Sequence, residues 1–276
     1  MTTVGLIGLG AMGSGMAQSL RRAGHEVHVF DVRREVAAAF AKHGGTAHDS
    51  LASLGAACDL IVSVVVNAAQ TESVLFGDDA NHGCAASMKP GSVFVMCSTV
   101  DPNWSVALEA RLEAMGLQYV DAPISGGAAK AASGQMTMMT AGKPEAYAVA
   151  EPFLNAMAAK VYKLGDSAGA GSKVKIINQL LAGVHIAAAA EAMALGLREG
   201  VDAAALYEVI TNSAGNSWMF ENRMAHVLAA DYTPLSAVDI FVKDLGIVLD
   251  MARASKFPLP LSSTAHQMFM QASTAG

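Results

Sequence analysis

"VGLIGLGAMG", residues 4–13, decides the fold of the first half of this chain. A short apolar run leads into three glycines, Gly8, Gly10 and Gly13, and a helical pattern follows them. Glycines in this order permit a tight turn, close approach of the backbone to a pyrophosphate, and close packing of a helix on a strand. The helix N-terminus offers free N–H groups and a partial positive charge to phosphate. The stretch therefore predicts a dinucleotide-binding loop, and the alternative is a structural glycine turn.

The contacts predicted for this cofactor run from the glycine loop to the end of the next strand. They are Gly8, Leu9, Gly10, Ala11, Met12, Gly13, Asp31 and Val32. A carboxylate at position 31 would accept hydrogen bonds from the adenosine ribose and repel a 2′-phosphate, which favours NAD over NADP. Arg33 and Arg34 argue in the other direction, because arginine can receive a 2′-phosphate.

In the first part of the chain, apolar strand-like runs alternate with helical segments, as they do in βαβ units. "DLIVSVVV", residues 59–66, is a continuous run of the kind found in parallel strands that are buried on both faces. Strands are expected at 4–7, 26–30, 59–66, 92–98, 117–123, 136–142 and 160–165, with helices at 11–23 and 33–42. The predicted fold class of residues 1–165 is α/β, a Rossmann-like doubly wound sheet of roughly seven or eight strands.

From residue 166 onward the pattern is helical throughout. Residues 171–200 contain no proline, much alanine, and Ile, Leu and Met at helical spacing, which predicts one long helix. Further helices are expected at 202–211, 217–229, 236–255 and 260–273. Residues 166–276 should form an all-helical substrate and oligomerisation domain, joined to residues 1–165 through the long interdomain helix.

The composition argues against several classes of protein. Hydrophobic residues make up 53% of the 276 residues, which suggests deeply buried helices, subunit contacts as in a homodimer or homotetramer, or both. The net charge of −6 does not suit a nucleic-acid surface. Charge, Gly or Asn interrupts the apolar stretches and no secretory signal opens the chain, so we expect a cytoplasmic protein without a membrane span. Cys58, Cys84 and Cys97 should be buried, reduced thiols, and no ligand spacing predicts a metal site.

Residues 165–175 admit two interpretations. "GDSAG" (165–169) fits the G-x-S-x-G pattern around Ser167, and Ser172-x-x-Lys175 fits S-x-x-K, so a serine hydrolase is one alternative. No HGGG-type oxyanion loop accompanies them. In the other interpretation Lys175 lies in the first turns of the long helix, where the helix dipole and burial favour a neutral amine that exchanges a proton with an alcohol. Without further context, a lysine near a helix start is more often a solvated surface residue.

Four stretches resemble the β-hydroxyacid dehydrogenase family, which includes 3-hydroxyisobutyrate dehydrogenase and reductases of tartronate semialdehyde, glyoxylate and succinic semialdehyde. They are "GLIGLGAMGSGMAQSL" (5–20), "DAPISGG" (121–127), "GAGSKVKIINQLL" (169–181) and "FVKDLG" (241–246). The resemblance covers nearly the whole chain and implies a nicotinamide-dependent dehydrogenase of a small hydroxy acid. Members of the family usually continue past "ASTAG" (272–276) with a further segment.

The resemblance also implies roles for individual residues. The catalytic residue would be Lys175. The substrate-binding residues would be Ser125, Gly126, Gly127, Asn178, Gln179, Asn67 and Trp218, and further cofactor contacts would be Thr99 and Lys243. A hydroxyl beside two glycines suits a carboxylate, because free N–H groups are exposed and no side chain blocks its approach.

Within the family, "VVVNAAQTESVLFG" (64–77) departs from the commoner pattern, which has Leu-Pro or Met-Pro near Asn67. The stretches "QLLAGVHIAAAAEAMALG" (179–196), "NSAGNSWMFENRM" (212–224) and "SAVDIFVKDLG" (236–246) resemble the members that oxidise L-threonate. Asn67, Asn216 and Asn222 could bond to a hydroxyl-rich substrate, whereas Trp218 and Phe220 are expected to be packing residues or, alternatively, a lid. The expected reaction is NAD-dependent oxidation of L-threonate at C2 to 2-oxo-tetronate. The alternatives are reduction of glyoxylate, succinic semialdehyde or tartronate semialdehyde, oxidation of 3-hydroxyisobutyrate, and a non-catalytic NAD-binding protein, which the presence of Lys175 opposes.

Overall fold

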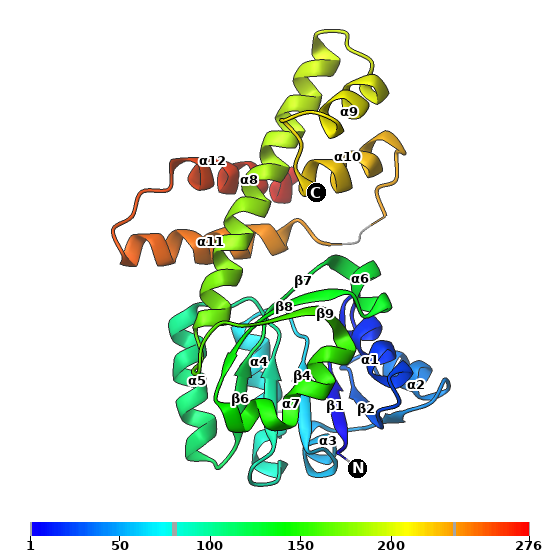
Figure 1. Cartoon of the computed structure of the whole chain (residues 1–276), viewed down its shortest axis with the longest axis vertical. Helices are drawn as coiled ribbons and strands as arrows, with labels where there is room; N and C mark the ends of the chain where they lie inside the picture. Colours follow the sequence, from blue (N-terminus) through cyan, green and yellow to red (C-terminus); the bar gives the residue numbers. More distant parts are fainter. Residues whose placement is uncertain (1, 79–81, 234–235, 276) are drawn as a thin grey trace. The chain divides into compact units, whose positions relative to one another are not determined.

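The computed structural model describes residues 2–78, 82–233 and 236–275. Its internal contacts divide the chain into two compact units, Met1–Lys175 and Ile176–Gly276 (Figure 1). The division falls inside the long helix α8 (Ala170–Arg198), because the first turn of α8 is hydrogen-bonded to strand β6 (Gln118–Asp121) of the first unit. The domain boundary predicted at residue 165 lies shortly before this point.

The first unit is built on a sheet of nine strands among the described residues. They are β1 (Val4–Ile7), β2 (Val27–Phe30), β3 (Thr46–Ala47), β4 (Leu60–Ser63), β5 (Val93–Met96), β6 (Gln118–Asp121), β7 (Ile124–Ser125), β8 (Met136–Gly142) and β9 (Ala158–Lys163). The strand order is β3-β2-β1-β4-β5-β6-β8-β7, with β9 paired to β8. Because the order reverses between β1 and β4, the carboxyl ends of these two strands form the switch point where open α/β sheets bind ligands.

Strands β1 to β6 pair with one another in parallel, whereas β8 runs antiparallel to both β6 and β7. Leu60 and Val62 of β4 belong to one buried cluster and Ile61 to another, so β4 is buried on both faces as its apolar run predicts. The surrounding helices are α1 (Gly13–Arg22), α2 (Arg34–Ala41), α3 (Leu51–Ala57), α4 (Ala68–Phe76), α5 (Pro102–Ala114), α6 (Gly127–Ser133) and α7 (Pro144–Met157).

The predicted Rossmann-like α/β fold followed by a helical domain is confirmed. The seven predicted strands are all present, with ends that differ by a few residues. The two-residue strands β3 and β7 raise the count above the expected seven or eight, since segments so short carry no alternating pattern. The antiparallel direction of β8 was not predicted, because the chain reaches β8 through β7 and the short helix α6.

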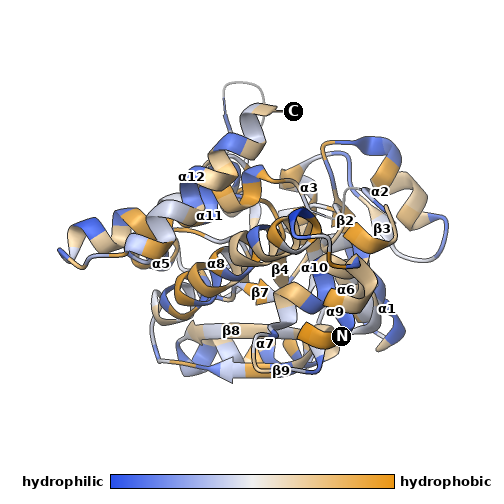
Figure 2. Cartoon of the chain, turned by 90° about the horizontal axis from the view of Figure 1, so that it is seen from above, coloured by the Kyte–Doolittle hydropathy of each residue, from blue (hydrophilic) through white to orange (hydrophobic). Residues whose placement is uncertain are grey.

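The second unit consists of helices packed along α8. They are α9 (Ala203–Thr211), α10 (Trp218–Leu228), α11 (Asp239–Ala254) and α12 (Pro260–Ala275). One buried cluster joins α8, α11 and α12 around Phe241 and Phe269, whose stacked rings have their centroids 5.0 Å apart. A second cluster joins α8 and α10 around Met193 and Phe220. Hydrophobic residues are spread along α8 (Figure 2).

The length and hydropathy of helix α8 do not agree with the expectation that no segment of the chain could span a membrane. By length and composition alone it is long and apolar enough, since one of its windows has a mean hydropathy of 1.7 and is 28% buried. The polar residues that interrupt this stretch are too few to bring the mean hydropathy down to that of an ordinary helix. Between Leu180 and Leu197 the only charged residue is Glu191. A core helix passes the same test, and both helical clusters pack on α8.

Candidate active site

The glycine loop joins β1 to α1 at the switch point of the sheet. Gly8 has a φ of +90°, and a Cβ there would lie 2.9 Å from the carbonyl oxygen of Val64. A Cβ at Gly13 would collide with the carbonyl oxygen of Gly8, whereas one at Gly10 would meet no atom of the described residues within 4 Å. Gly8 and Gly13 are therefore required by the fold, while Gly10 keeps open the surface that a pyrophosphate would approach.

The start of α1 also suits a dinucleotide. The N-cap residue Met12 makes no side-chain cap hydrogen bond, and the first turn contains no acidic residue, so no side chain competes with phosphate for the partial positive charge at this helix start. The hydroxyl of Ser14 donates to the carbonyl oxygen of Leu9 at 2.7 Å, which stabilises the turn. The residues present therefore fit a nicotinamide dinucleotide, whose pyrophosphate this loop would hold.

Asp31 ends β2 beside the same loop. One of its carboxylate oxygens accepts the N–H of Leu9 at 2.7 Å, and the other accepts the N–H of Arg33 at 2.8 Å and its Nε at 3.2 Å. Burial raises the pKa of Asp31, but the hydrogen bonds from Arg33 and Leu9 outweigh it and hold the pKa below its usual value. Asp31 is therefore a carboxylate at neutral pH, and Arg33 covers it in this structure. The neighbouring Val32 is 85% exposed.

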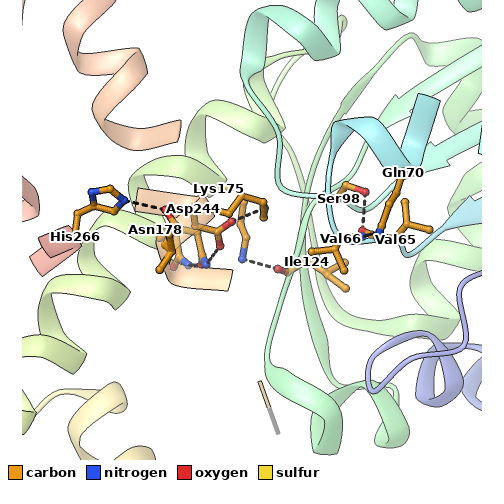
Figure 3. A network of polar contacts seen from close by, with 12 residues as sticks. Val65, Val66, Gln70, Ser98, Ile124, Lys175, Asn178, Asp244 and His266 are labelled. Atoms are coloured by element: carbon orange, nitrogen blue, oxygen red, sulfur yellow. Dashed lines mark hydrogen bonds and ion pairs between the residues drawn. The ribbon is translucent and has the colours of Figure 1, made fainter. Parts of the chain in front are cut away.

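Lys175 lies in the second turn of α8, and only 7% of its surface is exposed. Its Nζ donates a hydrogen bond to the carbonyl oxygen of Ile124 at 2.8 Å (Figure 3). Ile124 immediately precedes Ser125, Gly126 and Gly127, the loop predicted to bind a carboxylate. Gly126 has a φ of +141° and Gly127 a φ of +79°, conformations that favour glycine. The structure thus brings the predicted base next to the predicted carboxylate loop.

Asp121, which sequence reasoning did not single out, anchors the start of α8. Its side chain is fully buried and accepts hydrogen bonds from the N–H groups of Gly169 and Ser172, both at 2.9 Å. The hydroxyl of Ser172 donates to its other oxygen at 2.7 Å. Burial raises the pKa of Asp121, and the hydrogen bonds from Ser172 and Gly169 offset part of that effect. The signal available in the sequence was an acid at the end of an apolar strand.

In the second unit, Asn178 and Gln179 belong to a chain of polar contacts. Asn178 donates to the side-chain oxygen of Gln179 at 3.1 Å, and Gln179 donates to Asp244 at 2.5 Å. Lys243 also donates to Asp244, at 2.6 Å. Asp244 is buried, and it was not predicted as a site residue, unlike its neighbour Lys243. This carboxylate therefore fixes two of the predicted site residues.

Other predicted residues have structural roles that limit what they can bind. The side-chain oxygen of Asn67 accepts the N–H of Gln70 at 2.8 Å as the N-cap of α4, so one of its two acceptor positions is already used by the helix. Thr99 is half-buried just after β5, next to Ser98, whose hydroxyl donates to the carbonyl oxygen of Val65 at 2.7 Å.

Trp218 and Phe220 differ in their packing. Phe220 is buried and stacks on Tyr207 with ring centroids 5.9 Å apart, as expected of a packing residue. Trp218 is 53% exposed, and the choice between packing and a lid for its side chain stays a prediction. It is the first residue of α10, whereas Phe220 and Met224 supply the buried residues of this helix.

The serine hydrolase alternative finds no support in the geometry. Ser167 is exposed and, within residues 2–78, 82–233 and 236–275, makes no side-chain hydrogen bond to a histidine or an acid. Ser172 is buried, and its hydroxyl donates a hydrogen bond to Asp121. The three cysteines are buried and free, as predicted, and burial raises the pKa of both Cys58 and Cys84 to about 12.

A dinucleotide loop at the switch point, and a buried lysine beside a serine–glycine loop, are features of a nicotinamide-dependent dehydrogenase. Comparison with protein families agrees. Residues 3–165 match the NAD-binding domain of 6-phosphogluconate dehydrogenase, and residues 169–276 match the NAD-binding domain of NADP-dependent 3-hydroxyisobutyrate dehydrogenase. The chain belongs to this family of NAD-binding hydroxyacid dehydrogenases, and it is an oxidoreductase that takes a nicotinamide cofactor.

Individual relatives cover nearly the whole chain. L-threonate dehydrogenase of Cupriavidus necator is 67% identical over 99% of this chain and 91% of its own length. L-threonate dehydrogenase of Escherichia coli K12 is 50% identical over 99% of this chain and 90% of its own. The crystal structure of a 3-hydroxyisobutyrate dehydrogenase from Salmonella typhimurium superimposes with a TM-score of 0.94 at 51% identity, covering 100% of this chain and 95% of that one.

Proposed function

We propose that this dehydrogenase oxidises L-threonate at C2 to 2-oxo-tetronate with NAD⁺. The observation that carries the proposal is the placement of the buried Lys175 amine, which lies 2.8 Å from the carbonyl oxygen of Ile124. Ile124 is the residue immediately before Ser125-Gly126-Gly127. The 67% identity to an L-threonate dehydrogenase supports the choice of substrate. The further hydroxyls of threonate also suit a site that offers amide side chains, whereas 3-hydroxyisobutyrate carries only a methyl group besides its carboxylate and its single hydroxyl.

The chemistry divides between the protein and its cofactor. When bound, the nicotinamide supplies the acceptor for the hydride that leaves C2. Ser125, Gly126 and Gly127 hold the substrate carboxylate through a hydroxyl and backbone N–H groups. The neutral amine of Lys175 accepts the proton of the C2 hydroxyl, and the carbonyl oxygen of Ile124 then accepts a hydrogen bond from the resulting ammonium. Asn178 and Gln179 orient the substrate hydroxyls.

The choice of NAD over NADP rests on Asp31. Its carboxylate would accept hydrogen bonds from the ribose hydroxyls and repel a 2′-phosphate. Arg33 now pairs with both oxygens of that carboxylate, and it must move aside for the ribose to bind. The competing outcome is a shift of Arg33 toward a 2′-phosphate, which would admit NADP.

Assembly and location belong to the same proposal. Ile177, Leu181 and Leu195 of α8 are each more than half exposed and lie with Ala188 on one face of the helix, so a second copy of the chain would bury them in a homodimer or homotetramer. We name this row the apolar stripe of α8. Three buried free thiols suit the reducing cytoplasm, where we place the protein.

A panel of hydroxy acids tests the substrate, with the appearance of NADH followed by absorbance. L-threonate should exceed 3-hydroxyisobutyrate in kcat/KM by about 10⁴-fold, the margin by which a site that bonds to a hydroxyl rejects an analogue without it. The same panel run in reverse with glyoxylate, succinic semialdehyde and tartronate semialdehyde tests the alternative substrates. If 3-hydroxyisobutyrate turned over as fast as L-threonate, the assignment of substrate would be wrong.

A further inference from the structure

We propose that Asp121 is a positioning residue for the catalytic amine, because its buried carboxylate fixes the first turn of α8 and thereby the place of Lys175. The inference rests on the function proposed above, since it concerns the base of that reaction. Three hydrogen bonds join Asp121 to Gly169 and Ser172, at distances of 2.7 to 2.9 Å. All three donors lie immediately before or within the first turn of the helix.

The origin of this cap distinguishes α8 from other helices of the chain. Helices α3, α9 and α10 are capped by local residues, Ser50, Asp202 and Ser217, each of which accepts an N–H three residues further on. The carboxylate that holds the start of α8 comes instead from the end of β6, 51 residues before Ser172. A local cap fixes a helix only to itself, whereas this one fixes the helix to the sheet.

A second link repeats the connection one turn later. Ile124 follows Asp121 by three residues, and Lys175 follows Ser172 by three residues, so the pairs 121–172 and 124–175 tie the same two segments together. Residues three apart on a helix share a face. If α8 slipped by one residue, its side chains would turn by about 100°, which would carry the amine away from Ile124.

The backbone packing shows how little freedom this turn has. A Cβ at Gly171 would lie 2.9 Å from the carbonyl oxygen of Asp121 and would collide with the carbonyl oxygen of Met139. The first turn of α8 therefore rests directly on the backbone of β6 and β8. Backbone contact sets the distance between helix and sheet, and the carboxylate of Asp121 sets the rotation and register.

Glu109 of α5 supplies a matched comparison within the same region. It is also a buried acid, and its two oxygens accept the N–H of Ala168 at 3.1 and 3.2 Å. Burial raises its pKa as well, and the hydrogen bond from Ala168 lowers it. Because Ala168 precedes the helix, Glu109 holds the approach to α8 without touching the turn that carries Ser172. Loss of Glu109 should therefore cost stability but not catalysis.

A double-mutant cycle on the full chain tests the proposal. Asp121→Asn keeps one oxygen for the two N–H donors and removes the charge. It should lower kcat for L-threonate by about 10- to 100-fold, because a small misplacement of a catalytic group costs this much. KM and the Kd for NADH should change less than about twofold, because the base acts in the transition state and not in the binding of substrate or cofactor. The isotope effect of deuterium at C2 on kcat should rise, since the chemical step becomes slower relative to product release.

The decisive comparison uses a Lys175→Ala background, in which Asp121→Asn should change the residual kcat by less than about twofold. Glu109→Gln should leave kcat unchanged even if its Tm falls as far as the Tm of Asp121→Asn.

If Asp121→Asn does not fold, Ser172→Ala removes one hydrogen-bond donor to Asp121. It should give a smaller loss of kcat, and that loss should also disappear in the Lys175→Ala background. Equal losses in both backgrounds, or a fall in Tm without a loss of kcat, would overturn the inference. Full activity of Lys175→Ala alone would instead overturn the proposed function.

Discussion

Oxidation of an alcohol leaves a carbonyl only if the hydroxyl proton departs, so a positioned base should matter most in the transition state. Replacing Lys175 with Ala should therefore lower kcat by at least about 10²-fold, or about 2.7 kcal/mol of barrier. Lys175→Arg should not restore activity, because a guanidinium stays protonated and cannot accept the proton. Steady-state NADH production measures both variants.

Two controls define this experiment. NADH binding, followed by fluorescence, should survive in Lys175→Ala, because the glycine loop and Asp31 make their contacts without Lys175. Ser167→Ala should keep full kcat, since Ser167 is exposed and unpaired among the described residues. A Lys175→Ala enzyme with its kcat and pH–rate profile intact would remove this lysine from the mechanism.

Asp31 should decide the choice of cofactor by charge repulsion. The wild-type enzyme should use NAD⁺ with a clearly higher kcat/KM than NADP⁺, because the low pKa of Asp31 keeps its carboxylate ionised at neutral pH. Asp31→Ser should narrow the preference, and it also frees Arg33 for a 2′-phosphate. Arg33→Ala, which keeps the carboxylate, should leave NAD⁺ preferred. Equal use of both cofactors by the wild type would contradict this reasoning and shift the weight to Arg33 and Arg34.

Local sequence can suggest a site residue that lies in a recognisable motif. It cannot suggest one whose role depends on a partner that is distant in the sequence. Asp31 follows a glycine loop at a characteristic spacing, and Lys175 lies in the first turns of the predicted long helix, so both could be chosen as candidates from local sequence. Asp121 and Asp244 lie beside residues chosen as site candidates, yet their partners Ser172 and Gln179 are 51 and 65 residues away. Only the folded chain shows that these acids are buried and paired.

Among the elements, the loop between β1 and α1 offers a paired test of why its glycines are there. Gly13→Ala should lower the Tm, because its Cβ would collide with the carbonyl oxygen of Gly8. Gly10→Ala should keep the Tm within about 1–2 °C, since the added methyl meets no described atom, yet weaken NADH binding by at least about tenfold. Thermal unfolding and a fluorescence titration separate the two effects. Equal Tm values with equal NADH affinities would show that the loop does not bind the cofactor.

The same elements show what sequence patterns can and cannot reveal. The long strands and α8 were predictable because hydrophobic periodicity extends over many residues. The strands β3 and β7 contain two residues each, too few for a period, and β7 is the element that turns β8 antiparallel. Hydrophobic patterning also does not distinguish an exposed apolar stripe from a buried one, so the exposure of Leu181 and Leu195 appears only in the structure.

For the whole molecule, the apolar stripe of α8 raises the question of what covers it. We expect the purified protein, without detergent, to elute as a dimer or tetramer when its mass is measured by light scattering. The double variant Leu181→Glu, Leu195→Glu places two charges on the stripe, and it should dissociate toward the monomer because burying an unpaired carboxylate is costly. Far-ultraviolet circular dichroism should remain that of a helical protein, since both side chains are exposed within the chain.

Val209→Glu is the matched control, because Val209 is 62% exposed on α9 of the same unit but lies outside the stripe. It should leave the mass of the assembly unchanged. If the wild type were a monomer, or if Val209→Glu dissociated it as readily, the stripe would not be the subunit contact. If the chain instead required detergent for extraction, α8 would be acting as the membrane span that its length and hydropathy permit. The expected outcome follows from the packing of α8, because the two clusters bury other residues of this helix and leave the apolar stripe exposed.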